Sequence, residues 1–329
     1  MKALVLRRHG GLNDLEVVDN YQIPRATEGH VVIRVRASSF NYHDVFTVRG
    51  MPGIKVPLPV VIGLDMAGEI AEVGDDVSGF KRGDRVLVNP LDKKKGLMGE
   101  MLDGGMAEYC LVAADQLVAM PAHVTFEEAA SLPVAYGTAH RMLITHDTIR
   151  KGERVLVLGA SGGVGTGCVI LAKHLGAEVI ACASSADKMK RLKELGADEV
   201  INYMNVDFVG EILKRTKKRG VDLVVEHVGG DFLEKSIRCL TRGGRVVTVG
   251  GTKSYDCKVP VNYIFHKELQ IIGSNSATKH NLEVMMPLLG GGKLKTVIDR
   301  VFPLQEAADA HRYLESGKQF GKVVLRVTH

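Results

Sequence analysis

The stretch RVLVLGASGGVGTG, residues 154–167, decides the fold because it passes from an apolar strand through a glycine-rich turn into a helix. The apolar run 154–158 has the length of a buried strand, and the segment 163–176 has helical spacing that ends at a glycine. A second apolar run, residues 178–183, follows, so the unit spans about thirty residues, as a strand–helix–strand unit does. We therefore expect parallel strands in this part of the chain.

The glycine turn predicts a nucleotide-binding site rather than a purely structural turn. Helix amides that follow such a turn face the pyrophosphate of a dinucleotide. The literal G-x-G-x-x-G pattern is absent, because aligning it on Gly162 and Gly165 places Ala160 at the first position. This reshapes the turn slightly but leaves room for a phosphate. The residues expected to line it are Gly159, Ala160, Ser161, Gly162, Gly163, Val164 and Gly165.

The pattern of apolar runs and turn-forming residues changes twice along the chain, which predicts two domains. Residues 1–125 have short apolar runs rich in β-branched residues, with frequent turn signals, which predicts an antiparallel β domain. The same mixed pattern returns for residues 272–329. Between them, residues 126–271 alternate strands and helices, which predicts a doubly wound parallel sheet of the Rossmann type, and hence an α/β fold. Its six strands are expected at 154–158, 178–183, 199–202, 222–226, 245–249 and 269–274.

Composition narrows the classes of partner. The net charge of +5 is a mild excess, and the one dense basic run, KRTKKRG at 214–220, is expected at an exposed helix end, so we expect no nucleic-acid partner. No run approaches the roughly 20 apolar residues of a membrane helix, and the N-terminus is typical of a first strand rather than a signal peptide. The five cysteines lie far apart without a C-x-x-C pair, which indicates reduced core thiols in a cytoplasmic protein.

The end of the second parallel strand indicates which nucleotide binds. NAD sites carry an acid at this place to bind the ribose 2′-hydroxyl, whereas this chain has the neutral Ser184 and Ser185. Lys188 follows and offers a positive partner to a 2′-phosphate. The pattern favours NADP(H), although Lys188 as a solvated helix residue remains the alternative.

Several motifs in order resemble those of the medium-chain dehydrogenase/reductase family over essentially the whole chain. The motifs are SSFNYHD (38–44), VIGLDMAGEIAEVG (61–74), GFKRGDRV (79–86), MAEYCLV (106–112), LPVAYGTAHRML (132–143), the glycine turn and the closing GKVVL. The resemblance implies a GroES-like antiparallel β catalytic domain beside the Rossmann domain. It also implies pairing of subunits through the edge strand near 269–274, as a homodimer or homotetramer.

The chain departs from the zinc alcohol dehydrogenases of this family at the metal positions. Where they carry a Cys, a Gly-His-Glu and a further Cys or acid, this chain has Asn41, Gly63-Leu64-Asp65 and Val134. A catalytic zinc needs three N, S or O side chains, and the loop 89–105 lacks the four cysteines of the family's structural zinc. We therefore expect no metal, and the chain is similar to the zinc-less, quinone oxidoreductase-like branch.

That branch implies roles for further residues of this chain. Asn41 and Asp44 are expected to face the nicotinamide and substrate, and Lys188 and Tyr203 to hold the 2′-phosphate. The remaining cofactor positions that the resemblance implies are Thr138, Val249, Gly250, Ser274, Asn275 and Lys322, the last close to the cofactor phosphates.

Without a metal, hydrogen-bond donors must stabilise the developing oxyanion. Asn41 can donate through its amide, and His43 stands where zinc enzymes of the family place a proton-relay hydroxyl. The alternative for His43 is a histidine that packs or hydrogen-bonds under the cofactor ribose. Tyr42 is a rival donor, and water remains a third possibility, while Asp44 and Asp65 are expected to orient their neighbours. The apolar side chains expected either to line a substrate pocket or to pack in the core are Phe46, Met51, Met98, Met101 and Phe265.

Three functions are consistent with these features. The leading one is an NADPH-dependent, zinc-independent reductase of a small apolar quinone, enone, or ketone or aldehyde. An enoyl-thioester reductase requires a basic entrance for a phosphopantetheine arm, which the sequence does not define. A non-catalytic NADPH-binding protein has no need of Asn41, Asp44 and Thr138 together.

Overall fold

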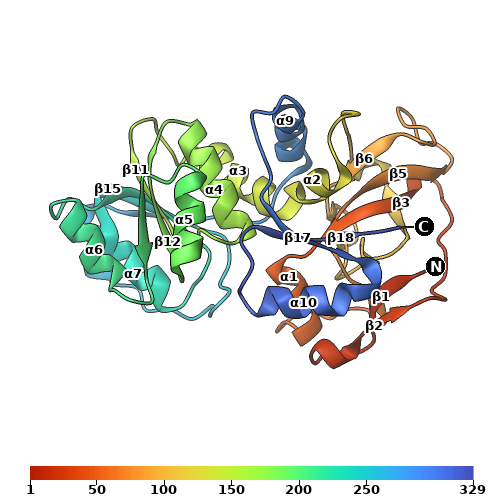
Figure 1. Ribbon diagram of the computed structural model, residues 1–329, viewed down its shortest axis with the longest axis horizontal. Coiled ribbons are helices and arrows are strands. Elements are labelled where there is room, and N and C mark those ends of the chain that lie inside the picture. Colours follow the sequence, from red (N-terminus) through yellow and green to blue (C-terminus); the bar gives the residue numbers. More distant parts are fainter. Residues whose placement is uncertain (329) are drawn as a thin grey trace. The chain divides into compact units, whose positions relative to one another are not determined.

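A computed structural model describes residues 1–328, which form two compact units (Figure 1). Unit 1 comprises Met1–Gly137 and the chain from Ala277 onward, and unit 2 comprises Thr138–Ser276. The sequence places the boundaries at 125 and 271. The short helix α2 (Phe126–Ala130) packs on the strands β3 (His30–Ser39) and β5 (Asp65–Val73), and it therefore belongs to unit 1.

Unit 2 contains a six-stranded parallel sheet, which confirms the predicted doubly wound α/β fold. The strands, in spatial order, are β13 (Glu199–Asn202), β12 (Glu178–Ala183), β11 (Arg154–Val157), β14 (Val221–Glu226), β15 (Leu240–Thr248) and β16 (Gln270–Gly273). The connections reverse direction between β11 and β14, and ligands of such sheets bind at this switch point, beyond the carboxyl ends of the strands.

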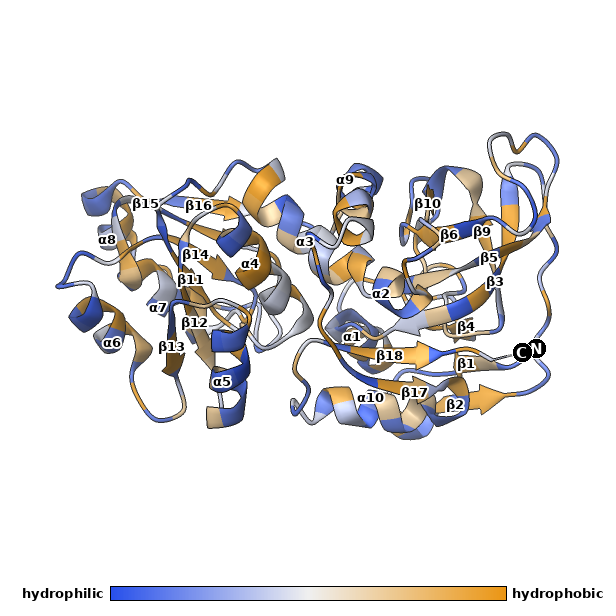
Figure 2. Ribbon diagram, turned by 45° about the horizontal axis from the view of Figure 1, so that its top comes forward, coloured by the Kyte–Doolittle hydropathy of each residue, from blue (hydrophilic) through white to orange (hydrophobic). Residues whose placement is uncertain are grey.

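Helices connect the strands of unit 2 because polar caps and apolar faces alternate along the sequence. Ser185 and Asp207 begin two of them, since each side chain accepts a backbone N–H of the first turn, from Lys188 and Gly210 respectively. The helices are α3 (Gly137–His140), the π-helical turn Arg141–Thr145, α4 (Gly163–His174), α5 (Ala186–Glu194), α6 (Phe208–Arg215), α7 (Asp231–Cys239) and α8 (Val261–Lys267). Figure 2 shows the strands of this sheet mainly hydrophobic and α5 mainly hydrophilic.

Unit 1 is built on antiparallel β structure, as predicted. It also contains one pair of parallel strands that the sequence analysis did not predict. Its main sheet runs β10 (Leu117–Ala119), β6 (Arg85–Val88), β5, β3, β18 (Lys322–Arg326) and β17 (Ile298–Pro303), with β9 (Tyr109–Ala113) also paired to β3. β17 and β18 are the parallel pair. The smaller sheets are β2 (Leu15–Val18), β1 (Ala3–Leu6) and β4 (Val60–Val61), and β7 (Leu91–Asp92) with β8 (Gly96–Leu97).

Short helices complete unit 1. They are α1 (Tyr42–Arg49), α2, α9 (Lys279–Gly290), α10 (Ala307–Glu315), the π-helical turn Leu132–Tyr136 and the 3-10 turns Leu12–Asp14, Ala114–Gln116 and Leu304–Glu306. The core between β3, β5, α1 and α10 contains Met98, whose side chain is fully buried. Core packing, one of the two roles expected of Met98, is thus confirmed. Phe265, by contrast, lies on α8 of unit 2 and is 62% exposed.

The cysteines follow the prediction with one exception. Cys110, Cys168, Cys182 and Cys239 are buried, and burial raises the pKa of the Cys182 thiol to about 12. Cys257 is exposed, so the expectation of a core residue is wrong there. Within residues 1–328, none of the helices combines the length and the apolar character that crossing a membrane requires.

Candidate functional site

A buried polar cluster lies in unit 1 where β3, β5 and β18 meet the start of α1. Asp65, which has no exposed surface, is its centre. Its Oδ2 lies 3.0 Å from Ser39 Oγ, 2.8 Å from Asn41 Nδ2 and 3.1 Å from Lys322 Nζ. Its Oδ1 accepts the backbone N–H of Val134 at 3.0 Å. The carboxylate therefore accepts hydrogen bonds at both oxygens, as a buried charge must.

Lys322 is the cation of this cluster, and its expected place close to the cofactor phosphates stays a prediction. Its side chain is 2% exposed, and Nζ donates to Phe40 O at 2.8 Å, to Asn41 Oδ1 at 2.6 Å and to Asp65 Oδ2 at 3.1 Å. An ammonium has three hydrogens, so these acceptors use all of them. We assign Lys322 to holding Asn41 and Asp65 in place.

Asn41 lies at the start of α1, and its side chain belongs to the cluster. Asn41 has extended backbone before α1, and Asp44 Oδ2 accepts its backbone N–H at 2.7 Å. The amide side chain of Asn41 is therefore available to Asp65 and Lys322. Asp44 has no exposed surface, and this burial raises the pKa of its carboxyl to about 7. Within residues 1–328, Asp44 Oδ1 has no hydrogen-bond partner.

His43 is paired with an acid that the sequence analysis missed. Nε2 of His43 lies 2.6 Å from Oε2 of Glu100, whose side chain is 6% exposed while that of His43 is 29% exposed. Fifty-seven residues separate the two, and Glu100 lies in an irregular loop, so no periodicity could have indicated the contact. Tyr42, the rival donor, packs edge-on against Phe46 with ring centroids 5.4 Å apart.

The glycine turn of unit 2 has the geometry of a phosphate cradle. Gly159 follows β11 with φ at +56°, a conformation that side chains disfavour. A Cβ at Gly165 would lie 2.3 Å from Gly159 O, so only glycine lets α4 approach the turn this closely. Gly162 begins α4 without a side-chain cap, which leaves the first-turn amides for a ligand. Ala160 is fully buried, and its N–H donates to Cys182 O.

Two residues at the switch point were not predicted. His227 directly follows β14. A Cβ at Gly159 would lie 2.7 Å from Nε2 of His227, so the imidazole packs against the turn. Burial lowers the pKa of His227 to about 4. Glu226 has no exposed surface and accepts the N–H groups of Val228 and Gly229, and burial raises its pKa. The run VVEHVGG contains both residues, but nothing in it marks them as neighbours of the turn.

The residues expected around the 2′-phosphate lie together at the carboxyl ends of β12 and β13. The N–H of Tyr203 donates to Ala183 O, the last residue of β12, which places Tyr203 beside Ser184. Ser185 caps α5 through the N–H of Lys188 at 3.3 Å, so its hydroxyl has a structural role. Lys188 is 8% exposed, which excludes the alternative of a solvated helix residue.

The remaining cofactor positions lie at the carboxyl ends of β15 and β16, apart from Thr138, which is 3% exposed on α3. Val249 directly follows β15, and its N–H donates to Glu226 O. The N–H of Ser274 donates to Thr248 O at 2.8 Å, and Asn275 O accepts a hydrogen bond from Arg141. Gly250 has φ at +145°.

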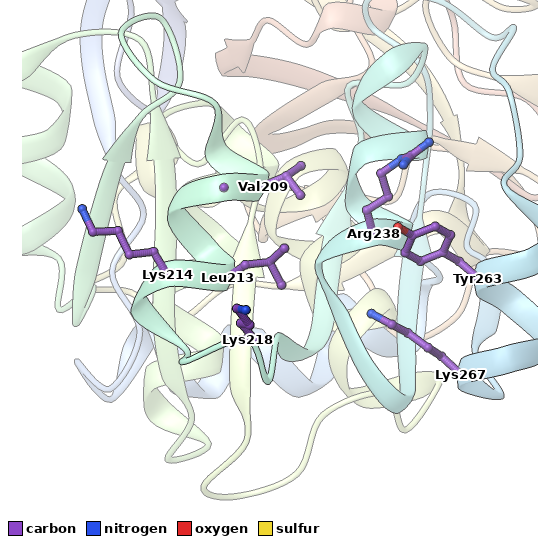
Figure 3. A pocket seen from close by; sticks show the side chains of 8 residues that line it. Val209, Leu213, Lys214, Lys218, Arg238, Tyr263 and Lys267 are labelled. Atoms are coloured by element: carbon purple, nitrogen blue, oxygen red, sulfur yellow. The ribbon is translucent and has the colours of Figure 1, made fainter.

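A basic groove of about 680 Å³ lies at the opposite ends of the strands (Figure 3). Its cations stand at or just beyond the C-terminal ends of α6, α7 and α8, where a positive charge complements the helix dipole. Arg238 pairs with Glu234, and Lys267 donates to Leu240 O. Helix ends account for these charges, including the basic run 214–220, whose predicted position at an exposed helix end is confirmed. The lining cations are Lys214, Lys218, Arg238 and Lys267.

Two known protein families match parts of this chain. Residues 27–122 match the family described as alcohol dehydrogenase GroES-like domain, and residues 195–325 match zinc-binding dehydrogenase. The human protein named quinone oxidoreductase is 32% identical over 332 residues, covering 99% of this chain and 97% of that protein. The chain belongs to the medium-chain dehydrogenase/reductase family. It is therefore an oxidoreductase of a family that binds a nicotinamide cofactor.

Other members of this family differ in cofactor and substrate. A chloroplastic NADPH-dependent alkenal/one oxidoreductase of Arabidopsis thaliana is 32% identical, covering 99% of this chain and 79% of that protein. An NAD-dependent alcohol dehydrogenase has a TM-score of 0.92 at 36% identity, with all of both chains covered. The 2-octenoyl-CoA carboxylase reductase CinF, in complex with NADP and 2-octenoyl-CoA, has a TM-score of 0.89 at 28% identity, covering 99% of this chain and 87% of that one.

The residues of this medium-chain dehydrogenase/reductase do not fit the zinc that one family description names. Asn41 and Leu64 are poor ligands, Val134 contributes only its backbone, and the Asp65 carboxylate already accepts hydrogen bonds at both oxygens. The Lys322 ammonium lies between Asn41 and Asp65 and would repel a dication. Within residues 1–328, no three His, Cys, Asp or Glu side chains gather as metal ligands would.

Proposed function

We propose that the protein is an NADPH-dependent reductase that delivers hydride to a quinone, an enone, or a ketone or aldehyde without zinc. The cluster of Asn41, Asp65 and Lys322 is the observation that carries this proposal. It puts a fixed ammonium and an oriented amide where, by the family resemblance, zinc enzymes bind their metal. The Asn41 amide replaces the Lewis acid with a hydrogen-bond donor, and the ammonium, whose three hydrogens are used within the cluster, holds that amide in place.

The amide of Asn41 is held in one orientation. Lys322 can only donate, so it selects Oδ1, and the Asp65 carboxylate can only accept, so it selects Nδ2. Asp65 takes one of the two Nδ2 hydrogens, and we assign the other to the substrate oxygen. A well-placed donor of this kind contributes roughly 3 kcal/mol to an oxyanion-like transition state. We assign the proton that completes the reduction to His43.

Unit 2 supports NADPH as the cofactor. The reduced nicotinamide supplies the hydride when bound. The glycine turn and the first turn of α4 hold the pyrophosphate, and no acid stands at the end of β12 to repel a 2′-phosphate. Lys188 and Tyr203 supply the positive charge and the hydroxyl for that phosphate, and the NADPH-dependent relative named above supports the same choice.

The test is NADPH oxidation against quinones, enones, ketones and aldehydes, with NADH in parallel and a chelator in duplicate. We expect turnover with NADPH on at least one carbonyl class and no change with chelator. Loss of activity on chelation would contradict the zinc-independent mechanism. Equal affinity for both cofactors would contradict the assignment to NADPH.

An enoyl-thioester reductase is the second candidate, because the structure of CinF with NADP and 2-octenoyl-CoA is similar to this one. Enoyl-CoA substrates therefore belong in the same assay. A higher kcat/KM on an enoyl-CoA than on the matched free enone would favour this candidate.

The edge strand of the parallel sheet supports self-association. β16 has one pairing partner, β15, and apolar side chains near it are exposed: Val261 by 63%, Phe265 by 62% and Ile271 by 44%. An edge of this kind is a template for pairing with a second copy. Light scattering after size exclusion should give a dimer or tetramer, and Ile271→Lys should shift it toward the monomer.

A further inference from the structure

Glu100 and His43 form a close pair in unit 1. Oε2 of Glu100 lies 2.6 Å from Nε2 of His43, and the carboxylate is almost fully buried whereas the imidazole is partly exposed. A buried carboxylate requires a fixed hydrogen-bond donor, and the imidazole supplies one. The pair therefore has a buried end at Glu100 and an accessible end at the ring of His43.

The loop that carries Glu100 is held in place by glycines on either side of it. A Cβ at Gly99 would lie 2.6 Å from the backbone N of Gly63, and one at Gly104 would lie 2.2 Å from Gly63 O. The loop also donates backbone N–H groups of Gly104 and Gly105 to Val61 and Gly63 at 2.7 and 2.9 Å. Because the backbone around Glu100 is fixed to the strand region before β5, the carboxylate has a defined position.

Other charges surround the pair. Asp44 is the next residue along α1, and the charges of His43, Asp65 and Lys322 all act on it. Lys322 and Asp65 form an ion pair 3.1 Å apart. A variant of Glu100 leaves these residues unchanged, so its effect is compared with the parent at the carboxylate of Glu100.

The position of Glu100 determines which ring nitrogen of His43 can react. A carboxylate at Nε2 keeps a proton on that nitrogen, as the partner of a histidine commonly does. We propose that Glu100 is the positioning residue of the reductase: it holds the His43 ring so that Nδ1–H delivers the proton to the reduced substrate. This inference rests on the proposed function.

The proton balance is complete. The hydride adds two electrons to the substrate carbon, and the proton on Nδ1 of the imidazolium moves to the substrate oxygen or, in an enolate, to carbon. The neutral ring keeps its Nε2 proton and its hydrogen bond to Glu100. Solvent then returns a proton to Nδ1, for which the 29% exposure of His43 gives access.

Glu100→Gln tests the charge, because glutamine can still accept the Nε2 hydrogen bond. We expect kcat to fall about 10- to 100-fold, the size that partners of functional histidines commonly show, with the KM for NADPH unchanged. Glu108→Gln, the same carboxamide change at a half-buried glutamate of unit 1, is the control. An unchanged kcat in Glu100→Gln would overturn the proposal.

A double variant separates positioning from stability. His43→Gln should lower kcat by about 10²-fold or more, and adding Glu100→Gln to it should lower kcat no further. Additive losses would show that Glu100 acts independently of His43, and a fully active His43→Gln would remove the proton donor, each contradicting the inference.

A readout without turnover distinguishes the failure of this inference from the failure of the proposed function. Imidazole ¹⁵N shifts at high pH should show the His43 proton on Nε2 in the parent, and a proton on Nδ1 would contradict the pair. If no substrate is reduced at all, the proposed function fails while the ¹⁵N result still reports on Glu100.

Discussion

The two candidate sites of this molecule are held by opposite means. In unit 1, buried charges fix the site. The side chains of Asp65 and Lys322 are both almost fully buried, and Lys322 Nζ lies 3.1 Å from Asp65 Oδ2. In unit 2, the absence of side chains forms the site, since Gly159 and Gly165 allow a turn and a helix to meet. The buried charges of unit 1 are destabilised when one partner is removed, whereas the close packing at the glycines of unit 2 is disrupted when a side chain is added. The two sites should therefore respond to different substitutions.

The largest effect is expected from removing the cation of unit 1. Lys322→Met leaves Asp65 buried without its charge partner, so the free energy of unfolding should fall by about 3–5 kcal/mol. Urea unfolding measures this, and Lys94→Met, on an exposed lysine, should leave stability unchanged. Adding Asp65→Asn to Lys322→Met should recover part of the loss. A fall of less than about 1 kcal/mol would mean that the charge pair does not hold the site.

The next effect concerns Asp44, a buried carboxyl of unit 1 that has, within residues 1–328, one oxygen without a hydrogen-bond partner. Burial raises the pKa of Asp44 to about 7, above the ordinary value near 4, so the folded state retains the proton longer than the unfolded chain. Its contribution to the free energy of unfolding therefore falls as pH rises from about 4 to about 7, by no more than about 1.4 kcal/mol per pH unit.

Asp44→Asn tests this by urea unfolding at several pH values. The variant should gain stability relative to the parent as pH rises through this window, because asparagine does not ionise and still accepts the N–H of Asn41. The exposed Asp115→Asn is the control. A constant difference between parent and Asp44→Asn across the window would contradict the buried-carboxyl interpretation.

Adding one methyl group should break the site of unit 2. Gly165→Ala forces a Cβ to within 2.3 Å of Gly159 O, so we expect a loss of about 1–3 kcal/mol and a weaker affinity for NADPH. For stability, Gly162→Ala is the matched control, because its φ is −82° and the nearest atom is 3.5 Å away. Thermal unfolding compares the two variants, and NADPH fluorescence titration compares Gly165→Ala with the parent. Equal stability of the two variants would show that close packing of the turn is unimportant.

The last prediction sharpens the choice of cofactor and concerns binding rather than folding. If Lys188 holds the 2′-phosphate as proposed, Lys188→Met removes one charge-assisted hydrogen bond worth about 1.5–3 kcal/mol, or roughly a 10- to 100-fold loss of NADPH affinity. NADH lacks that phosphate and should bind as before. The exposed Lys190→Met on the same helix is the control. Equal losses for both cofactors would place Lys188 outside the phosphate site.

The sequence predicted unit 2 well because its signals are local. The strand, turn and helix around Gly159 lie within about thirty residues, and the parallel strands agree with their predicted positions to within one residue, except that β15 begins five residues earlier. Ser185 shows the limit of local reasoning. Its place after β12 predicts a cofactor contact, but did not reveal that its hydroxyl also caps α5.

Unit 1 was harder to predict because its contacts join distant parts of the chain. The hydrogen bond from Lys322 to Asn41 spans 281 residues, and alignment to a family gave Lys322 a position in sequence but not a partner. Glu100 was missed for the same reason, since it lies in a loop without periodicity. His43 was found only through its place in the NYHD motif.

Asn41 has a consequence for how this protein can change over evolutionary time. The same residue precedes the first turn of α1 and holds its side chain between Lys322 and Asp65. A substitution that alters reactivity there also removes a hydrogen-bond partner from two buried charges, Lys322 and Asp65. New chemistry is therefore more accessible at the neighbouring Tyr42, whose ring packs on Phe46 instead.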